Sequence, residues 1–226
     1  MKPDRIVAID GPSGSGKGTV SRAVARALGW ALLDSGALYR LVALAARQAG
    51  ISLDDEARLA SIATDFDIRF GVAKDGEEAI WLAGEDVTRL IRTETAGSDA
   101  SRVAQLKGVR AALLQRQRRF AKGPGLVADG RDMGSIVFPG APVKIYLTAS
   151  PEERATRRHK QLKEKGVTAN LAALSQEIAE RDRRDMNRAV APLVAAPDAV
   201  LIDTTGMPIE AVVERILAIV RERLLI

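Results

Sequence analysis

A glycine-rich segment near the N-terminus has the residue types and spacing that bind phosphate. Its glycines let successive backbone N–H groups converge on phosphate oxygens, and a helix that follows presents its positive end to the same anion. Lys17 can reach the β- and γ-phosphates of a nucleotide and neutralise charge during transfer. A glycine-rich turn that merely contains a lysine is the alternative, which the apolar run before and the helical pattern after disfavour. The predicted phosphate-binding residues are Gly11, Pro12, Ser13, Gly14, Ser15, Gly16, Lys17, Gly18 and Thr19.

This loop departs from the general P-loop pattern in one position. The residue after Lys17 is Gly18, and the hydroxyl of Thr19 comes one residue later than the hydroxyl that usually binds magnesium. The Gly-Lys-Gly-Thr ending resembles the nucleoside monophosphate kinases more than the GTPases. We therefore assign no direct metal ligand, and expect Mg²⁺ to be held mainly by ATP phosphates and water.

A transferase also needs an acceptor, and two further segments have suitable chemistry. Asp34–Arg40 follows one apolar run and Asp129–Gly134 follows another. Ligands of open parallel sheets lie beyond the carboxyl ends of the strands. Each segment supplies an arginine, whose forked guanidinium suits phosphate, and a glycine that permits close approach of the backbone. These segments predict a second, anionic substrate.

A charged run contains Arg181, Asp185 and Arg188, whose spacing of four and three places them on one helix face. From spacing alone, a solvated helix surface with internal ion pairs is an equally good interpretation. The cluster Arg154, Arg157 and Arg158 has the same two interpretations. It lies where an arginine on the ATP side would be wanted, but the sequence does not say which of the three acts.

Taken together, these segments resemble bacterial cytidylate kinases, and the resemblance covers essentially the whole chain. The matching motifs are the phosphate loop, Leu-Leu-Asp-Ser-Gly-Ala-Leu-Tyr-Arg at 32–40, Ala-Asp-Gly-Arg-Asp-Met-Gly at 128–134, and Glu-Arg-Asp-Arg-Arg-Asp-Met-Asn-Arg at 180–188. The resemblance implies transfer of the γ-phosphate of ATP to CMP or dCMP, giving ADP and CDP or dCDP. A kinase for another nucleoside monophosphate, such as UMP, is the alternative.

The resemblance also implies roles for individual residues. Lys17, Arg131 and Arg188 are the expected catalytic residues. The residues expected to bind the CMP phosphate are Ser35, Arg40 and Arg131, and those expected to bind cytosine are Ser101, Arg110 and Asp132. The ribose is expected to contact Arg181 and Asp185, with Arg188 nearer the phosphates. The family pattern further implies an enlarged monophosphate-binding lobe around 65–92 and a short lid around 159–167.

The elements that must position these residues follow from the apolar pattern. Five short apolar runs separated by helical stretches predict an α/β fold, in which a five-stranded parallel sheet carries helices on both faces. Expected strands are Arg5–Ile9, Ala31–Asp34, Gly125–Asp129, Val143–Leu147 and Ala199–Ile202; expected helices are Lys17–Leu28, Ala37–Ala49, Ser52–Thr64 opened by a capping box, Thr95–Ala121, Ser150–Lys165, Asn170–Arg188 and Pro208–Leu225. Between them, alternation at Asp67–Phe70, turns at Lys74–Gly76 and Gly84–Asp86, and an apolar run at Ala79–Leu82 predict a small antiparallel insert.

Composition limits the remaining choices. The 226 residues, 46% of them hydrophobic, suggest one kinase domain spanning 1–226, with the insert and lid within it. The sequence has no cysteine and no apolar run of membrane-spanning length, so we expect a cytoplasmic protein without a membrane partner. We also expect a monomer. His159 is expected on the surface, and Trp30 and Trp81 are expected to be packing residues.

Two other classes of protein fit less well. A GTPase switch needs Ser or Thr after the loop lysine and an Asn-Lys-x-Asp guanine reader, and neither is present. The net charge of +5 allows a nucleic-acid-binding P-loop protein, but aromatic residues make up only 4% of the chain. The arginines follow strand ends and one helix face, which favours small phosphorylated substrates over nucleic acid.

Overall fold

The computed structural model describes residues 5–73, 78–164, 166 and 168–225, and the chain divides into two compact units. The first unit comprises residues 1–34 and 118–226, and the second comprises 35–117. The turn predicted at Lys74–Gly76 and two residues of the predicted lid, 165 and 167, lie outside the described residues.

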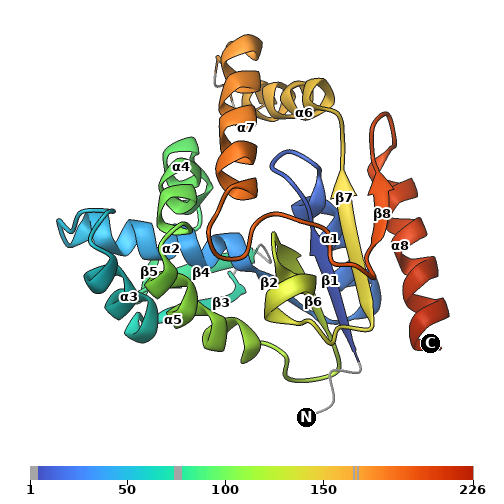
Figure 1. Cartoon of the computed structure of the whole chain (residues 1–226), viewed down its shortest axis with the longest axis horizontal. Helices are drawn as coiled ribbons and strands as arrows, with labels where there is room; N and C mark the ends of the chain where they lie inside the picture. The colour runs from blue at the N-terminus through green and yellow to red at the C-terminus, as the bar shows by residue number, and fades with distance from the viewer. Residues whose placement is uncertain (1–4, 74–77, 165, 167, 226) are drawn as a thin grey trace. The chain divides into compact units, whose positions relative to one another are not determined.

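The first unit is built on a five-stranded parallel sheet with the order β2-β6-β1-β7-β8 (Figure 1). This confirms the predicted parallel sheet, because each expected run forms a strand. Every residue of the central strands β1 and β6 is buried, so their side chains need apolar neighbours on both faces. The strands are β1 Ile6–Asp10, β2 Ala31–Asp34, β6 Leu126–Gly130, β7 Val143–Thr148 and β8 Val200–Asp203.

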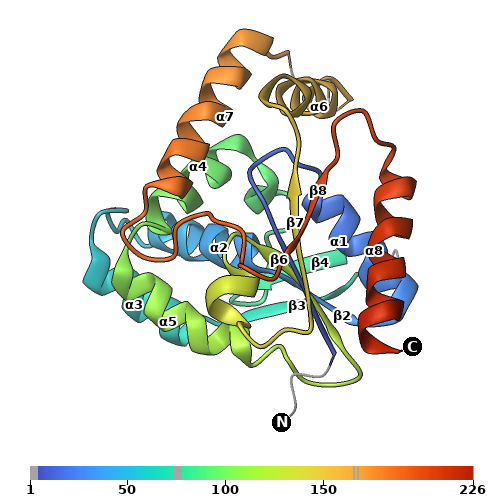
Figure 2. The ribbon, with the colours of Figure 1, turned by 45° about the vertical axis from the view of Figure 1, so that its right-hand side comes forward.

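Helices α1 (Lys17–Leu28) and α8 (Ile209–Leu224) pack against each other and share one apolar core with the sheet. Helices α6 (Pro151–Glu164) and α7 (Leu171–Met186) lie side by side, as Figures 1 and 2 both show. A short π-helix, η2 (Met133–Val137), packs against β1 and β6. Trp30 packs against the shared core, as expected for a structural residue.

Local side-chain caps fix where α6 and α7 begin. Ser150 Oγ accepts from the backbone N–H of Glu153 at 3.2 Å, and Asn170 Oδ1 accepts from the N–H groups of Ala172 and Ala173 at 2.9 and 3.1 Å. Both caps were predicted. The end of α7 was not: the helix stops at Met186, so Arg188 follows the helix and does not lie on its face.

The second unit combines helices with a small three-stranded sheet of order β3-β4-β5. Its strands pair antiparallel, and Trp81 on β4 packs under the guanidinium of Arg69 at 4.0 Å from its ring centre. The elements are α2 Ser35–Gln48, α3 Glu56–Asp65, β3 Ile68–Val72, β4 Glu78–Leu82, β5 Glu85–Asp86, the 3₁₀-helix η1 Leu90–Arg92, α4 Glu94–Val103 and α5 Lys107–Arg118.

Three sequence predictions in this unit were wrong in detail. The helix expected over Thr95–Ala121 is two helices, interrupted after Val103. Helix α3 is capped by Asp55, whose carboxylate accepts from the N–H of Arg58, and not by Ser52. The turn expected at Gly84–Asp86 lies at Ala83–Gly84, where φ is 49° and 82°, and Glu85 already pairs with Leu82.

We predict that Gly11→Ala destabilises the protein far more than Gly29→Ala. Both glycines have positive φ, 153° and 65°, but a Cβ on Gly11 would lie 2.1 Å from the carbonyl oxygen of Leu147, whereas Gly29 has open space. Gly29→Ala should cost about 1 kcal/mol of unfolding free energy, from the left-handed backbone alone. Gly11→Ala should cost about 3 kcal/mol or more. Denaturant unfolding measures both, and equal losses would contradict the prediction.

Candidate functional site

The predicted phosphate loop lies between β1 and α1, and glycines with positive φ shape it. These are Gly11, Gly14 and Gly16, with φ of 153°, 77° and 85°. Gly16 is the N-cap of α1 and has no side chain to bind the free N–H groups of the first turn. An uncapped helix N-terminus behind a glycine-rich loop is a ready site for an anion.

The carbonyl groups of this loop are held by side chains of the first unit. Lys17 Nζ donates to the carbonyl oxygen of Pro12 at 2.8 Å. Arg154 Nη1 donates to the carbonyl of Ser13 at 3.0 Å, and Arg157 Nη1 approaches the carbonyl of Ser15 at 3.4 Å. Of the three arginines that the sequence left undecided, Arg154 and Arg157 contact the loop, while Arg158 donates to Gln161.

Lys17 and Asp129 form a buried pair of opposite charges beside the loop. Burial lowers the pKa of Lys17 and raises the pKa of Asp129, because loss of water disfavours both charged forms, and each charge partly offsets this for the other. Asp129 Oδ1 has no hydrogen-bond partner among the described residues. From the sequence, Asp129 was part of a candidate acceptor segment but had no role of its own, although an acidic residue near the end of a fully buried strand was a usable signal.

Asp10, also missed from the sequence, fixes the chain that follows β6. Its two carboxylate oxygens each accept a backbone N–H at 2.8 Å, from Met133 and from Gly134. These bonds anchor the start of η2 directly after Arg131 and Asp132. Burial raises the pKa of Asp10 to about 6, although both hydrogen bonds favour the charged form. The partners of Asp10 lie more than a hundred residues away in sequence, so no local pattern predicts them.

Several predicted acceptor residues of the first unit come together. Arg131 Nε donates to Asp185 Oδ2 at 3.0 Å, and Arg188 Nη2 lies 3.4 Å from Asp185 Oδ1. Burial acts to raise the pKa of Asp185, but Arg131, Arg188 and Arg181 outweigh it and lower that pKa. The charges of Arg131 and Arg181 also act on Lys17, so this cluster lies within electrostatic range of the phosphate loop.

The second unit holds the other predicted substrate residues. Ser35 is the buried first residue of α2, and Arg40 Nη1 donates to the carbonyl of Ile91 at 2.6 Å. Ser101 is buried on α4, and its hydroxyl has no hydrogen-bond partner among the described residues. Arg110 on α5 donates to the carbonyl of Ala104 at 3.2 Å and lies over the ring of Tyr39 at 5.6 Å from its centre.

Comparison with known proteins decides the family. The family model described as cytidylate kinase matches residues 7–222. The chain belongs to the cytidylate kinase family. Cytidylate kinases of Stutzerimonas stutzeri and of a Pseudomonas aeruginosa strain are 58% and 60% identical to it. The first match covers 99% of this chain and 98% of the relative, and the second covers 94% and 93%.

A solved structure of an uncharacterized protein from Eubacterium ventriosum also resembles this cytidylate kinase family member. The TM-score is 0.55 at 11% identity, over 97% of this chain and 99% of that one, so the likeness concerns the fold alone. Within the described part of the chain, no helix is long and apolar enough to cross a membrane, and no group of three or more His or acidic side chains could hold a metal ion.

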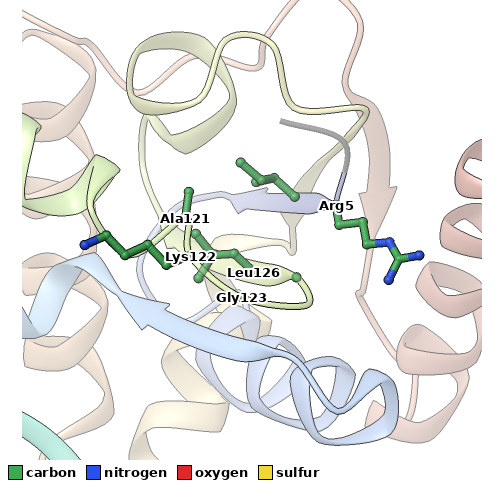
Figure 3. A pocket seen from close by; sticks show the side chains of 7 residues that line it. Arg5, Ala121, Lys122, Gly123 and Leu126 are labelled. Carbon is green, nitrogen blue, oxygen red and sulfur yellow. The ribbon is translucent and has the colours of Figure 1, made fainter. Parts of the chain in front are cut away.

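A separate cavity of about 230 Å³ lies at the amino ends of β1 and β6, whereas the phosphate loop follows the carboxyl end of β1. Figure 3 shows that Arg5 and Lys122 extend their charged ends away from it in opposite directions. What remains of its lining is apolar or backbone. The lining residues are Arg5, Ile6, Ala121, Lys122, Gly123, Gly125 and Leu126. None of them is a predicted site residue.

We predict that the ionisation of Asp10 destabilises the folded protein as pH rises. The pKa of Asp10 is about 6 in the folded protein against 3.8 for an ordinary aspartate, so the folded state binds the proton more tightly. Stability is therefore lost between about pH 4 and pH 6, by about 3 kcal/mol for a shift of this size. Asp10→Asn removes this titration, so the unfolding free energy of the mutant should rise relative to that of wild type over that pH range. Urea denaturation at a series of pH values measures both.

Asp203→Asn is the control of opposite sign. A hydrogen bond from Thr205 lowers the pKa of Asp203. The unfolding free energy of wild type should therefore rise relative to that of Asp203→Asn as pH rises. If the Asp10→Asn and Asp203→Asn differences changed with pH in the same direction, the account of Asp10 would be wrong.

Proposed function

We propose that this protein transfers the γ-phosphate of ATP to CMP or dCMP, giving ADP and CDP or dCDP. Membership of the cytidylate kinase family supports the reaction. The observation that carries it in the structure is the charge cluster of the buried Lys17, Asp185 and Arg188 with the partly exposed Arg131, near a phosphate loop at the carboxyl ends of parallel strands. Phosphoryl transfer depends on such positioning and charge neutralisation more than on covalent chemistry.

On the donor side, the loop from Gly11 to Thr19 binds the ATP phosphates and Lys17 acts on the transferring group. An anionic phosphate beside Lys17 favours the protonated amine, which offsets the lowering of its pKa by burial. Arg131 and Arg188 supply further positive charge. The acceptor is a phosphate oxygen of CMP, which is already anionic near neutral pH, so the reaction needs no strong general base.

On the acceptor side, Ser35, Arg40 and Arg131 bind the CMP phosphate, and Arg181 and Asp185 bind the ribose. Ser101, Arg110 and Asp132 bind the cytosine. The hydroxyl of Ser101 supports this assignment, because it is buried without a hydrogen-bond partner among the described residues, which leaves hydrogen-bonding capacity for a ligand. Asp132 is 4% exposed, and a carboxylate can accept a hydrogen bond from the amino group of a base.

Mg²⁺ accompanies ATP, and the residues present fit a small contribution of the protein to binding of the ion. Asp129 Oδ1 is buried without a hydrogen-bond partner among the described residues, and the charge of Asp34 acts on Asp129. Carboxylate oxygens suit Mg²⁺, which keeps much of its water shell. Asp129 would hold the hydrated ion, with Asp34 adding negative charge, and the ion would neutralise charge on the phosphates.

Other nucleoside monophosphates, UMP above all, are the alternative acceptors. A coupled ADP-release assay with CMP, dCMP, UMP, AMP and GMP separates them, and highest kcat/KM for CMP or dCMP is expected. We propose that the protein acts as a monomer on these small molecules, without nucleic acid. The absence of cysteine is consistent with a cytoplasmic location.

We predict that Lys17→Ala abolishes turnover while the protein still folds. Loss of a major electrostatic contact to the transferring phosphoryl group should lower kcat by about 10³-fold or more. Lys122→Ala, in the cavity at the opposite strand ends, is the control and should retain wild-type kcat. Steady-state rates and thermal unfolding of both variants check this, and near-normal kcat in Lys17→Ala would refute the assignment of the loop.

We predict that Asp132→Asn changes the choice of base. A carboxylate accepts from the N4 amino group of cytosine but faces a carbonyl oxygen in uracil, to which an amide can donate. The variant should lose about 1–3 kcal/mol of recognition in kcat/KM for CMP, and much less for UMP. Both acceptors are measured with both proteins. An equal fall for CMP and UMP would mean that Asp132 serves the metal or the local fold.

A further inference from the structure

Thr204 follows β8 and is 2% exposed, and its hydroxyl lies at a junction of three segments. Thr204 Oγ1 lies 3.3 Å from the carbonyl oxygen of Ser15 in the phosphate loop and 3.0 Å from the carbonyl oxygen of Thr148 at the end of β7. It also accepts from Arg157 Nη1 of α6 at 2.9 Å. No sequence motif drew attention to this residue.

The hydroxyl of Thr204 has one hydrogen, and the carbonyl groups of Ser15 and Thr148 are its two candidate acceptors. The carbonyl of Thr148 already accepts the backbone N–H of Thr204 at 2.8 Å. For the carbonyl of Ser15, by contrast, the contacts within the described part of the chain are the Thr204 hydroxyl at 3.3 Å and the longer 3.4 Å approach of Arg157. Removing the hydroxyl would leave Thr148 with the backbone N–H of Thr204, whereas Ser15 would lose the nearer of its two described contacts and keep only the 3.4 Å approach of Arg157.

The orientation of the Ser15 carbonyl matters because of the peptide that it belongs to. In a trans peptide the C=O and the following N–H point in opposite directions, and the described chain has no cis bond. Holding the carbonyl of Ser15 on the side of Thr204 aims the N–H of Gly16 to the other side. The same argument applies to the carbonyl of Ser13, which Arg154 holds, and to the N–H of Gly14.

Arg157 is itself held in place by this junction. Its Nη2 donates to the carbonyl of Thr204 at 2.6 Å, and its Nε donates to Glu153 at 2.8 Å. These two donors and the Nη1 that donates to the Thr204 hydroxyl belong to one rigid guanidinium, so the hydroxyl of Thr204 completes a fixed fork. Helix α6 and the residue after β8 thus act on the same loop peptide.

We infer that Thr204 is a positioning residue for the ATP phosphates, acting through the Ser15 carbonyl and Arg157 to aim the N–H of Gly16. The inference rests on the proposed function in taking ATP as the ligand of the loop. It assigns Thr204 no contact with the acceptor. The predicted consequence is therefore a loss of ATP affinity, with CMP affinity and the chemistry of the bound substrates largely preserved.

The test compares Thr204→Val, Thr204→Ser and the control Thr205→Val. The hydroxyl of Thr205 is also hydrogen-bonded, to Asp203 and to the N–H of Ser150, but not to the loop. Calorimetry gives the Kd of ATP, initial rates give KM for ATP and for CMP, and thermal unfolding gives Tm. Thr204→Val should raise the Kd and KM of ATP about three- to tenfold, in line with one lost hydrogen bond.

Thr204→Ser keeps the hydroxyl and should bind ATP within about twofold of wild type, as should Thr205→Val. An unchanged ATP Kd in Thr204→Val, or a lowered Tm as its only effect, would overturn the inference. If Thr204→Val does not fold, loss of ATP affinity in a folded Thr204→Ser would overturn it too. Failure of wild type to phosphorylate CMP would refute the proposed function, but the ATP calorimetry would still test the role of Thr204. Failure of wild type to bind ATP would overturn both the proposed function and this inference.

Discussion

The structure of the first unit depends on one constraint, which is that opposite charges buried at the carboxyl ends of parallel strands must compensate each other. Asp10 ends β1, Asp129 is the residue before the last of β6, and Lys17 begins α1. All three are under 9% exposed. Burying a charge without a partner costs several kcal/mol, so the backbone N–H groups of η2 and the lysine are obligatory neighbours. The turn geometry around these strand ends follows from that requirement.

The same requirement explains why α6 and α7 carry so many arginines. Arg154 of α6 is buried and pairs with Asp182 of α7 while it donates to the carbonyls of Ala149 and Ser13. The charged faces of these helices are therefore not merely solvated surface. Arg154, paired with α7, holds the phosphate loop, and Asp185 near the end of α7 lies between Arg131 and Arg188. An enzyme that neutralises phosphate needs such positive charge in place before its substrate arrives.

The sequence predicted the sheet, the phosphate loop and most helix starts because these depend on local pattern. Buried strands such as Ile6–Asp10 are short apolar runs, and the caps Ser150 and Asn170 act within three residues. Prediction from the sequence failed where a residue's partners lie far away in the chain. Thr204 and Asp10 owe their roles to partners in other elements, and the break after Val103 interrupts a stretch that has helical character throughout. Arg188 was placed on a helix face because charge spacing does not mark where α7 ends.

Gly11 has a consequence for how this family is compared across species. A side chain at this position would collide with the backbone carbonyl of Leu147, which belongs to the sheet itself. Packing of the sheet therefore restricts position 11 to glycine, whatever ligand the loop binds. Invariance there among homologues would record the packing of β1 beside β7, and would carry no information on substrate. Positions such as 204, where serine retains the hydroxyl and valine does not, are where variation can report on function.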